Sequence, residues 1–253
     1  MNDAEIIRHI NAGANHYIAL FGEAEHMERY DAGNYSIVRP KPGEEGISFI
    51  YNIRVDALEP VEQHAVAQEI RAAGMPFWLD LMASDEVFAL FFGKEKPHGQ
   101  TEFAFDNEQY LAMIPNHFIN QPASQRIIEV RTPDEFALWA RLANDLLAGG
   151  HTDIHPVHHF NLVERGLMRC YMLYADGQPV SIAATMDQEG IVSLELVATL
   201  PEFRRNGYAR EVCAKAIQDA VDTHCKLLTV RANSAASASV YRSLGFQVYN
   251  HAL

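Results

Sequence analysis

The sequence predicts a mixed α/β (α+β) fold, with a mixed central sheet in the C-terminal half of the chain. Three observations lead to this class. Strand-like and helix-like segments alternate from residue 126 onward. The composition is 48% hydrophobic and 21% charged, which is typical of a globular protein with a real core. A polar segment at 116–126 contains Pro122 and separates two differently patterned halves of the 253-residue chain. We therefore expect domains at 1–120 and 125–253.

The C-terminal half reads as ten elements. "RIIEVR" is typical of a strand, and "PDEFALWARLANDLL" has the apolar spacing of one helical face. "PVHHFNLVERG" predicts a short helix with Pro156 in its first turn. Strands, tight turns and helices then follow in the order "CYMLYA", "VSIAATM", "IVSLELVATL", "AREVCAKAIQDAVDTH", "KLLTVRA", "SASVYRSLG" and "FQVYNHA". The predicted order is β-α-α-β-β-β-α-β-α-β.

The N-terminal half has a less regular pattern. "ISFIYNIRV", "EPVEQHAVAQEIRAAG", "PFWLDL" and "SDEVFALFFG" predict strand, helix, strand and helix. This order resembles the later part of the C-terminal half. The aromatic stripes in "FWLDLM" and "FALFFG" are typical of core packing, with an edge available to wall a binding site.

Charge and cysteine content restrict the function. The formal net charge of −13 argues against a nucleic-acid or anionic-membrane binder, because phosphate backbones need a broad basic face. Three unpaired cysteines indicate reduced thiols. The N-terminus has no signal-peptide pattern, and no apolar run is long enough to span a bilayer. We expect a cytoplasmic protein.

The stretch "LPEFRRNGYAR", Leu200–Arg210, gathers positive charge around one glycine. Pro201 should end the preceding strand, and Gly207 allows tight backbone geometry next to a ligand. The helix that follows exposes unpartnered N–H groups and the positive end of its dipole. Strand, turn and helix N-terminus together predict a cradle for a phosphate or pyrophosphate. The alternative is a solvated turn that happens to hold arginines.

This context resembles the GNAT N-acetyltransferase superfamily. The family's acyl-CoA loop, Gln/Arg-x-x-Gly-x-Gly/Ala, is similar to "RRNGYA", although Arg205 stands where a glycine is common. "LVATLPEF" looks like the family's strand ending, and "NSAASASVYRSLGF" resembles its next element. The resemblance covers the C-terminal half and implies a GNAT-type sheet there. It suggests a tandem protein whose N-terminal half is a degenerate GNAT-like domain, because no arginine-glycine turn occurs in that half.

The resemblance implies residues for acetyl-CoA. In the family, the fourth strand splays from the fifth, and its free backbone groups hold pantetheine and the thioester. The implied cofactor-binding residues are Val197, Ala198, Thr199, Arg204, Arg205, Asn206, Gly207, Tyr208, Ala209, Arg210, Asn233 and Ser234.

Two residues are candidates for proton transfer. Tyr241 matches the family's tyrosine that protonates the departing thiolate, and a phenol pKa near ~10 suits a thiol leaving group. The alternative for Tyr241 is a packed core residue. Glu195 interrupts an apolar strand two residues before Val197, which predicts a shared sheet face. It is a candidate general base, directly or through water, and its alternative is a salt-bridged or edge-exposed glutamate.

The segment "HTDIHPVHHF" contains four histidines and an aspartate. Pro156 breaks any single helix through His151, His155 and His159, so a metal site is disfavoured and we expect no metal. These residues, with His158 and Asp153, are better interpreted as acceptor contacts or loop residues.

We therefore predict an acyl-CoA-dependent N-acyltransferase that moves an acetyl group from acetyl-CoA to a small-molecule or peptide amine. A non-catalytic acyl-CoA sensor or scaffold and a histidine-based hydrolase or metal enzyme are the alternatives. The acidic balance favours a cationic acceptor.

Overall fold

Seven strands form the larger of two sheets in the computed structural model, which describes residues 1–80, 82–93, 109–120, 126–147 and 153–249. Their order is β10-β4-β9-β8-β7-β6-β5. Only β8 and β9 are parallel, and every other neighbouring pair is antiparallel. The strands are β4 (Gln109–Met113), β5 (Ile127–Glu129), β6 (Arg169–Ala175), β7 (Gln178–Gln188), β8 (Ile191–Thr199), β9 (Leu227–Ala232) and β10 (Gln247–Val248).

The predicted mixed α/β class and the element order of the C-terminal half are confirmed. The helices of this half are α4 (Pro133–Leu147), α5 (Phe160–Glu164), α6 (Tyr208–Asp222) and α7 (Ala235–Arg242). One boundary was wrong, because α5 begins at Phe160 and Pro156 lies in the turn before it. In that turn the His155 ring accepts hydrogen bonds from the N–H groups of Val157 and His158, which holds the chain outside helical geometry.

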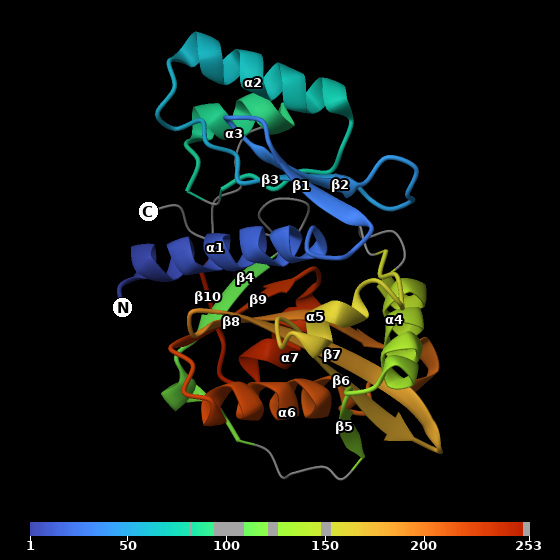
Figure 1. Cartoon of the computed structure of the whole chain (residues 1–253). Helices are drawn as coiled ribbons and strands as arrows, with labels where there is room; N and C mark the ends of the chain where they lie inside the picture. The colour runs from blue at the N-terminus through green and yellow to red at the C-terminus, as the bar shows by residue number, and fades with distance from the viewer. Residues whose placement is uncertain (81, 94–108, 121–125, 148–152, 250–253) are drawn as a thin grey trace.

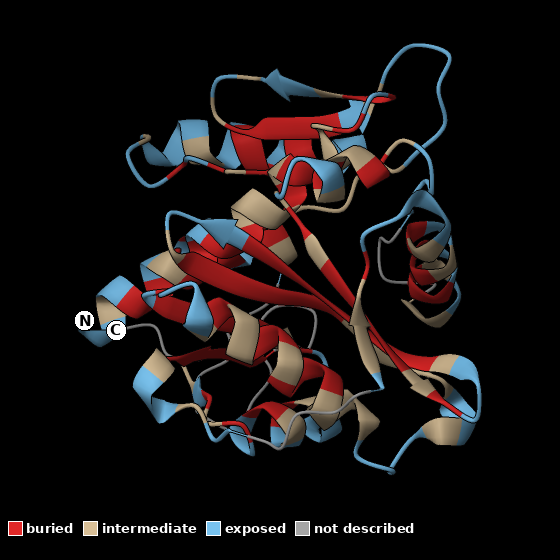
Figure 2. Ribbon diagram, turned by 60° about the horizontal axis from the view of Figure 1, so that its bottom comes forward, coloured by how far each residue is buried: buried red, intermediate tan, exposed pale blue. Residues whose placement is uncertain are grey.

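Helices cover both faces of the large sheet (Figure 1). Alternate residues of β6 show the division. Tyr171 and Leu173 pack into the core on the α6 and α7 face. Cys170 and Met172 pack into the core below α4 on the opposite face. The buried strands of the sheet run between these layers (Figure 2).

The first helix, α1 (Asp3–Phe21), lies between the large sheet and the rest of the N-terminal region (Figure 1). Asn2 caps it, since the Asn2 side chain accepts from the Glu5 N–H and the Glu5 side chain accepts from the Asn2 N–H. At Gly13 an added Cβ would lie 3.3 Å from Thr229 Oγ1, so glycine allows α1 to approach β9 closely. This helix was not among the elements predicted from the sequence.

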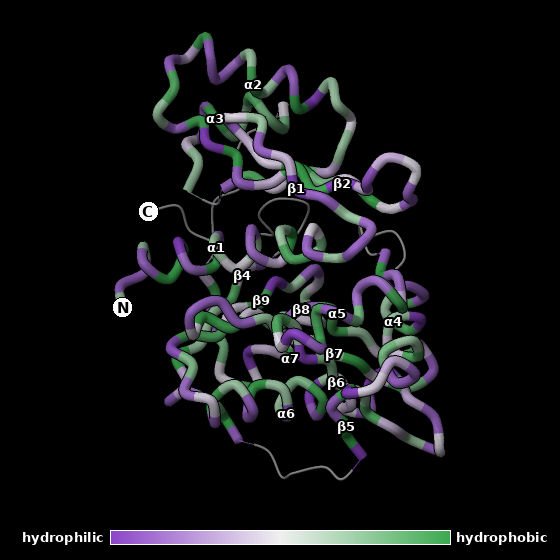
Figure 3. Tube along the Cα trace, viewed as in Figure 1, coloured by the Kyte–Doolittle hydropathy of each residue, from purple (hydrophilic) through white to green (hydrophobic). Residues whose placement is uncertain are grey.

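The small sheet has the antiparallel order β1-β2-β3, with β1 at Met27–Asp31, β2 at Ser36–Pro40 and β3 at Phe49–Tyr51. Two helices, α2 (Pro60–Ala73) and α3 (Asp85–Phe92), follow it. Hydrophilic and hydrophobic segments alternate along α2 (Figure 3), and its buried residues are Val66, Ala67 and Ile70. Phe77 adds a parallel bridge to Ile50. The first predicted strand and both predicted helices are therefore present, but within the described residues the predicted strand "PFWLDL" is only a single bridge at Phe77. A degenerate GNAT-like domain is not confirmed.

The two regions share a strand. β4 precedes the predicted boundary at 116–126, yet it pairs with β9 on one side and β10 on the other. The N-terminal region is thus joined to the large sheet by hydrogen bonds as well as by α1. The division into 1–120 and 125–253 stays a prediction. None of the described helices has the length and apolar content needed to cross a membrane.

Candidate active site

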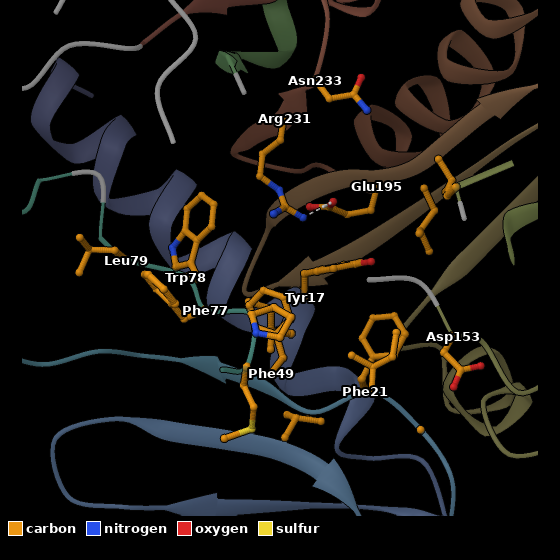
Figure 4. A pocket seen from close by; sticks show the side chains of 18 of the residues that line it. Tyr17, Phe21, Phe49, Phe77, Trp78, Leu79, Asp153, Glu195, Arg231 and Asn233 are labelled. Atoms are coloured by element: carbon orange, nitrogen blue, oxygen red, sulfur yellow. Dashed lines mark hydrogen bonds and ion pairs between the residues drawn. The ribbon is translucent and has the colours of Figure 1, made fainter. Parts of the chain in front are cut away.

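A pocket of about 890 Å³ lies between the N-terminal region and the large sheet. Residues from both halves of the chain line it (Figure 4). Four predicted site residues are among them: Val197, Asn233 and the two proton-transfer candidates, Glu195 and Tyr241. The structure therefore brings together residues that are up to 46 positions apart in the sequence.

The side of the pocket that comes from the N-terminal region has no charged side chain among its described lining residues. We call this side the apolar wall. It consists of Tyr17, Ile18, Phe21, Met27, Val38, Gly46, Ile47, Phe49, Met75, Pro76, Phe77, Trp78, Leu79, Phe91 and Phe92. Both aromatic stripes of the sequence contribute to it, so these segments serve packing and the pocket at once.

An ion pair lies against two rings of the apolar wall. Arg231 Nη2 donates to Glu195 Oε2 at 2.9 Å, and both side chains are largely buried, with 18% and 8% exposed. The Arg231 guanidinium also lies 5.1 Å from the Tyr17 ring centroid and 5.4 Å from that of Trp78. Figure 4 shows the pair between these rings and the strands. Glu195 is thus salt-bridged, as one alternative held, and also lines the pocket.

Strand β8 is irregular at this pair. Leu196 has a φ of +54°, which is the left-handed region, and the register to β7 shifts between Ile182 and Ala184. The bulge interrupts the alternation of side chains, so the shared-face argument for Glu195 and Val197 does not hold. Four consecutive residues of β8, Leu194 to Val197, line the pocket instead.

The strands β8 and β9 separate at the same point. Among the described residues, they pair only from Ile191 to Leu194 of β8. In the described residues, the backbone of β8 beyond Leu194 is therefore not paired with β9, in line with the predicted splay. Further along, Ser181 Oγ donates to the Ala198 carbonyl at 3.0 Å and Arg204 Nε donates to the Thr199 carbonyl at 3.1 Å. Those two carbonyls are consequently engaged within the chain.

The segment from Asn233 to Tyr241 forms the other border of the split. Ser234 caps α7 by accepting from the Ser237 N–H at 3.1 Å, which gives it a structural role. Asn233 precedes the cap and lines the pocket. Tyr241 is 4% exposed, and its ring lies 6.0 Å from that of Phe246. Tyr241 is therefore both a packed residue and a pocket residue.

The predicted anion cradle is at the start of α6. Gly207 is the N-cap with a φ of +83°, and an added Cβ would meet nothing within 4 Å. Arg205 also has a left-handed φ, +65°, so the residue that stands in place of a common glycine keeps glycine-like geometry. The first helical bond runs from the Glu211 N–H to the Gly207 carbonyl at 3.0 Å. The N–H groups of Tyr208, Ala209 and Arg210 precede this bond and have no carbonyl acceptor within the helix.

The histidines gather at the edge of the pocket. His26, which sequence reasoning missed, has its ring centroid 4.8 Å from His158 and 5.1 Å from His159. Burial, together with the neighbouring imidazole of His26, lowers the pKa of His159 to about 3. Within the described residues, no three His, Cys, Asp or Glu side chains are arranged to hold a metal ion. His151 lies outside the described residues.

Arg231 and the α1 aromatics were also missed. Arg231 is a single arginine within the apolar strand "LLTVRA". A charged residue that interrupts an apolar strand indicates a functional site or a buried partner, and the same argument was made for Glu195. Tyr17 and Phe21 belong to a helix that the sequence analysis did not predict. Neither residue carries a motif.

Comparisons with known proteins give a matching family model and similar folds. Residues 124–246 match the model of the acetyltransferase (GNAT) family. A GCN5-related N-acetyltransferase from Kribbella flavida is similar over 94% of this chain and 92% of its own, with 20% identity and a TM-score of 0.63. A GCN5-related N-acetyltransferase-like protein from Streptococcus suis 89/1591 is similar over 98% and 96%, with 13% identity and a TM-score of 0.51. No curated protein matches the chain. The two structures show a shared fold.

Proposed function

Since residues 124–246 match the model of the acetyltransferase (GNAT) family, we propose that the protein transfers an acetyl group from acetyl-CoA to an amine. The observation that carries this proposal is the split between β8 and β9 after Leu194. The split opens into the pocket that holds Glu195 and Tyr241, and α6 begins beyond the end of β8. A pantetheine arm in the split would connect a pyrophosphate on α6 with a thioester in the pocket.

Each reacting group then has a task. Backbone N–H groups of β8 near Val197 polarise the thioester carbonyl. The acceptor ammonium gives a proton to Glu195, directly or through water, and the amine nitrogen attacks the carbonyl carbon. The C–S bond breaks, and Tyr241 donates its phenol proton to the departing thiolate. The acylated nitrogen gives its second proton back to the Tyr241 oxygen, and Glu195 releases its proton to solvent. The products are an amide and free CoA.

The pyrophosphate site is tested with Gly207→Glu. The change places bulk and negative charge in the open space at the start of α6, where the proposal puts the pyrophosphate. We expect the Kd for CoA, measured by calorimetry, to rise roughly 100-fold or more, since charge-assisted contacts become repulsive. Normal CoA affinity in a folded variant would contradict the proposed location.

Gly177→Glu is the matched control. Gly177 also has a left-handed φ, +77°, and an added Cβ would also meet nothing within 4 Å. It lies in the turn between β6 and β7, outside the pocket lining. The two variants therefore carry the same backbone strain and the same added charge. Only Gly207→Glu should weaken CoA binding.

A non-catalytic acyl-CoA sensor is the second candidate. The Glu195–Arg231 ion pair favours it, because a carboxylate stabilised by a guanidinium accepts a proton less readily. A sensor would bind acetyl-CoA and release no thiol with any amine in a single-turnover assay. An enzyme would release one thiol for each amide formed.

A further inference from the structure

We propose that the acceptor is a primary amine carried on an aromatic or aliphatic body, such as an arylalkylamine. This inference rests on the proposed function and deepens it by naming the substrate class. It follows from the division of the pocket into an uncharged wall and a charged side, which come from different parts of the chain. An acceptor that fits both sides has an ammonium at one end and apolar surface along the rest.

The apolar wall is built to receive apolar surface. The Phe77 ring centroid lies 5.2 Å from that of Phe92 and 5.7 Å from that of Phe91, so these rings hold one another in place. Phe49 and Phe77 are only partly buried, and both line the pocket. Covering such rings with a ligand removes apolar area from water, whereas a polyhydroxylated or polycationic ligand would leave its polar groups without partners there.

The charged side favours a cation. Asp153 and Glu195 are carboxylates that line the pocket, and Arg231 is a guanidinium that pairs with Glu195. His159 also lines the pocket, and its lowered pKa keeps the imidazole neutral at pH 7. The described lining therefore carries one excess negative charge. Asp153 lies on the Phe21 side of the pocket, away from Trp78 (Figure 4). An ammonium is attracted to the end of the pocket near Asp153, because the Tyr17 and Trp78 rings already hold the Arg231 guanidinium.

Amines of matched size test the inference. With acetyl-CoA, free thiol release is followed for ethylamine, the n-alkylamines from propyl to hexyl, 4-phenylbutylamine, spermidine and 1,4-diaminobutane. We expect kcat/KM to rise roughly fourfold for each added methylene. The sharpest pair is pentylamine and 1,4-diaminobutane, which have the same number of heavy atoms. Pentylamine should exceed the diamine by roughly 100-fold, because the second ammonium would have to enter the apolar wall.

Phe77→Ala and Phe49→Ala test whether the apolar wall causes the preference for apolar amines. Each should lower kcat/KM for 4-phenylbutylamine by roughly 10-fold or more, while kcat/KM for ethylamine stays within about twofold. Phe77→Leu should recover most of the loss. The control is Phe118→Ala, which removes an equally half-buried phenyl ring outside the pocket and should change neither value. Loss of activity toward both amines in folded Phe77→Ala would contradict a role in acceptor choice.

Binding is measured separately from turnover through Trp78. The chain has two tryptophans, and Trp139 is fully buried in the core below α4, away from the pocket. Titration with 4-phenylbutylamine should therefore produce a saturable change in the fluorescence of Trp78, and Trp78→Phe should abolish this change. Spermidine should produce no such change at the same concentration.

The outcomes separate this inference from the proposed function. Faster turnover of 1,4-diaminobutane or spermidine than of pentylamine overturns the inference and leaves the acetyltransferase proposal standing. Saturable binding of 4-phenylbutylamine at Trp78 without thiol release from any amine overturns the proposed function while supporting the chemistry assigned to the pocket. If the apolar amines neither bind nor turn over, the inference is overturned outright.

Discussion

Tyr241 illustrates, at the scale of one residue, how packing and chemistry can coincide. Its side chain is 4% exposed in the core beside Phe246, yet it lines the pocket. A phenol in that position is held in one orientation by its neighbours, so a proton can be delivered without first ordering the side chain. The two sequence-based alternatives for Tyr241 are therefore compatible.

We expect Tyr241→Phe to lower kcat roughly 100-fold, the scale of a lost general acid, with little change in CoA affinity. The ring is kept, so the melting temperature should stay nearly constant. Single-turnover thiol release is measured beside kcat, because slow product release would hide a slower chemical step. Wild-type single-turnover rates would assign Tyr241 to packing alone.

His159 makes stability depend on pH. Its folded-state pKa of about 3 lies below the ordinary value of 6.5. Between these two pH values the imidazole is therefore protonated in the unfolded chain and neutral in the folded chain. The stabilisation is complete above pH 6.5 and is lost as the pH falls toward 3. The free energy of unfolding should fall by about 1.4 kcal/mol per pH unit for this proton.

Urea titrations between pH 7 and pH 4.5 measure that slope. His159→Asn is the comparison, because the Asn side-chain oxygen can accept the His155 N–H that His159 Nδ1 accepts at 2.8 Å. Asparagine does not titrate, so its curve should be shallower below pH 6.5. Parallel curves for the two proteins would show that His159 is not responsible.

At the scale of elements, the strands and helices that could be predicted were those with strong local patterns. The helix Pro133–Leu147 has the predicted bounds, because its apolar spacing and the flanking residues mark both ends. The helix α1 carries a similar local signal, because Asn2 and Glu5 form a capping box at its start. This helix was not among the predicted elements, so its residues Tyr17 and Phe21 were absent from the predicted site.

Other features could not be read because they depend on distant pairing. Nothing local in Gln109–Met113 indicates that this strand pairs with β9 on one side and β10 on the other. The left-handed Leu196 is similar, since leucine rarely adopts that conformation and no turn residue marks it. The apolar wall likewise arises from residues 17 to 92, which only the folded chain brings into one pocket with Glu195.

β4 leads to a prediction for truncated chains. A chain of residues 125–253 lacks β4, so β9 loses its antiparallel partner and the buried Leu111 and Met113 are removed from the core. We expect this chain to be unfolded by circular dichroism and by its melting behaviour. A cooperatively melting fragment with wild-type CoA affinity would show that the strand is dispensable.

At the scale of the whole molecule, the two halves are not equivalent. The split beside β8 and the cradle at Gly207 belong to the C-terminal half. The N-terminal region has a three-stranded antiparallel sheet, and "RVDALEPVEQ" stands where a second cradle would be. Calorimetry should therefore give one CoA per chain. Two equivalent sites would mean that the N-terminal region also binds the cofactor.

The apolar wall and the residues proposed to face the thioester are encoded by separate stretches of the gene. One stretch encodes residues 17 to 92 of the wall, and another encodes residues 194 to 241, with the split, Glu195, Gly207 and Tyr241. Under the proposed function, natural selection can retune the choice of amine without altering the residues assigned to acyl transfer. Exchange of the gene segment for residues 1–93 between related genes would then pass on a substrate preference as a single heritable unit.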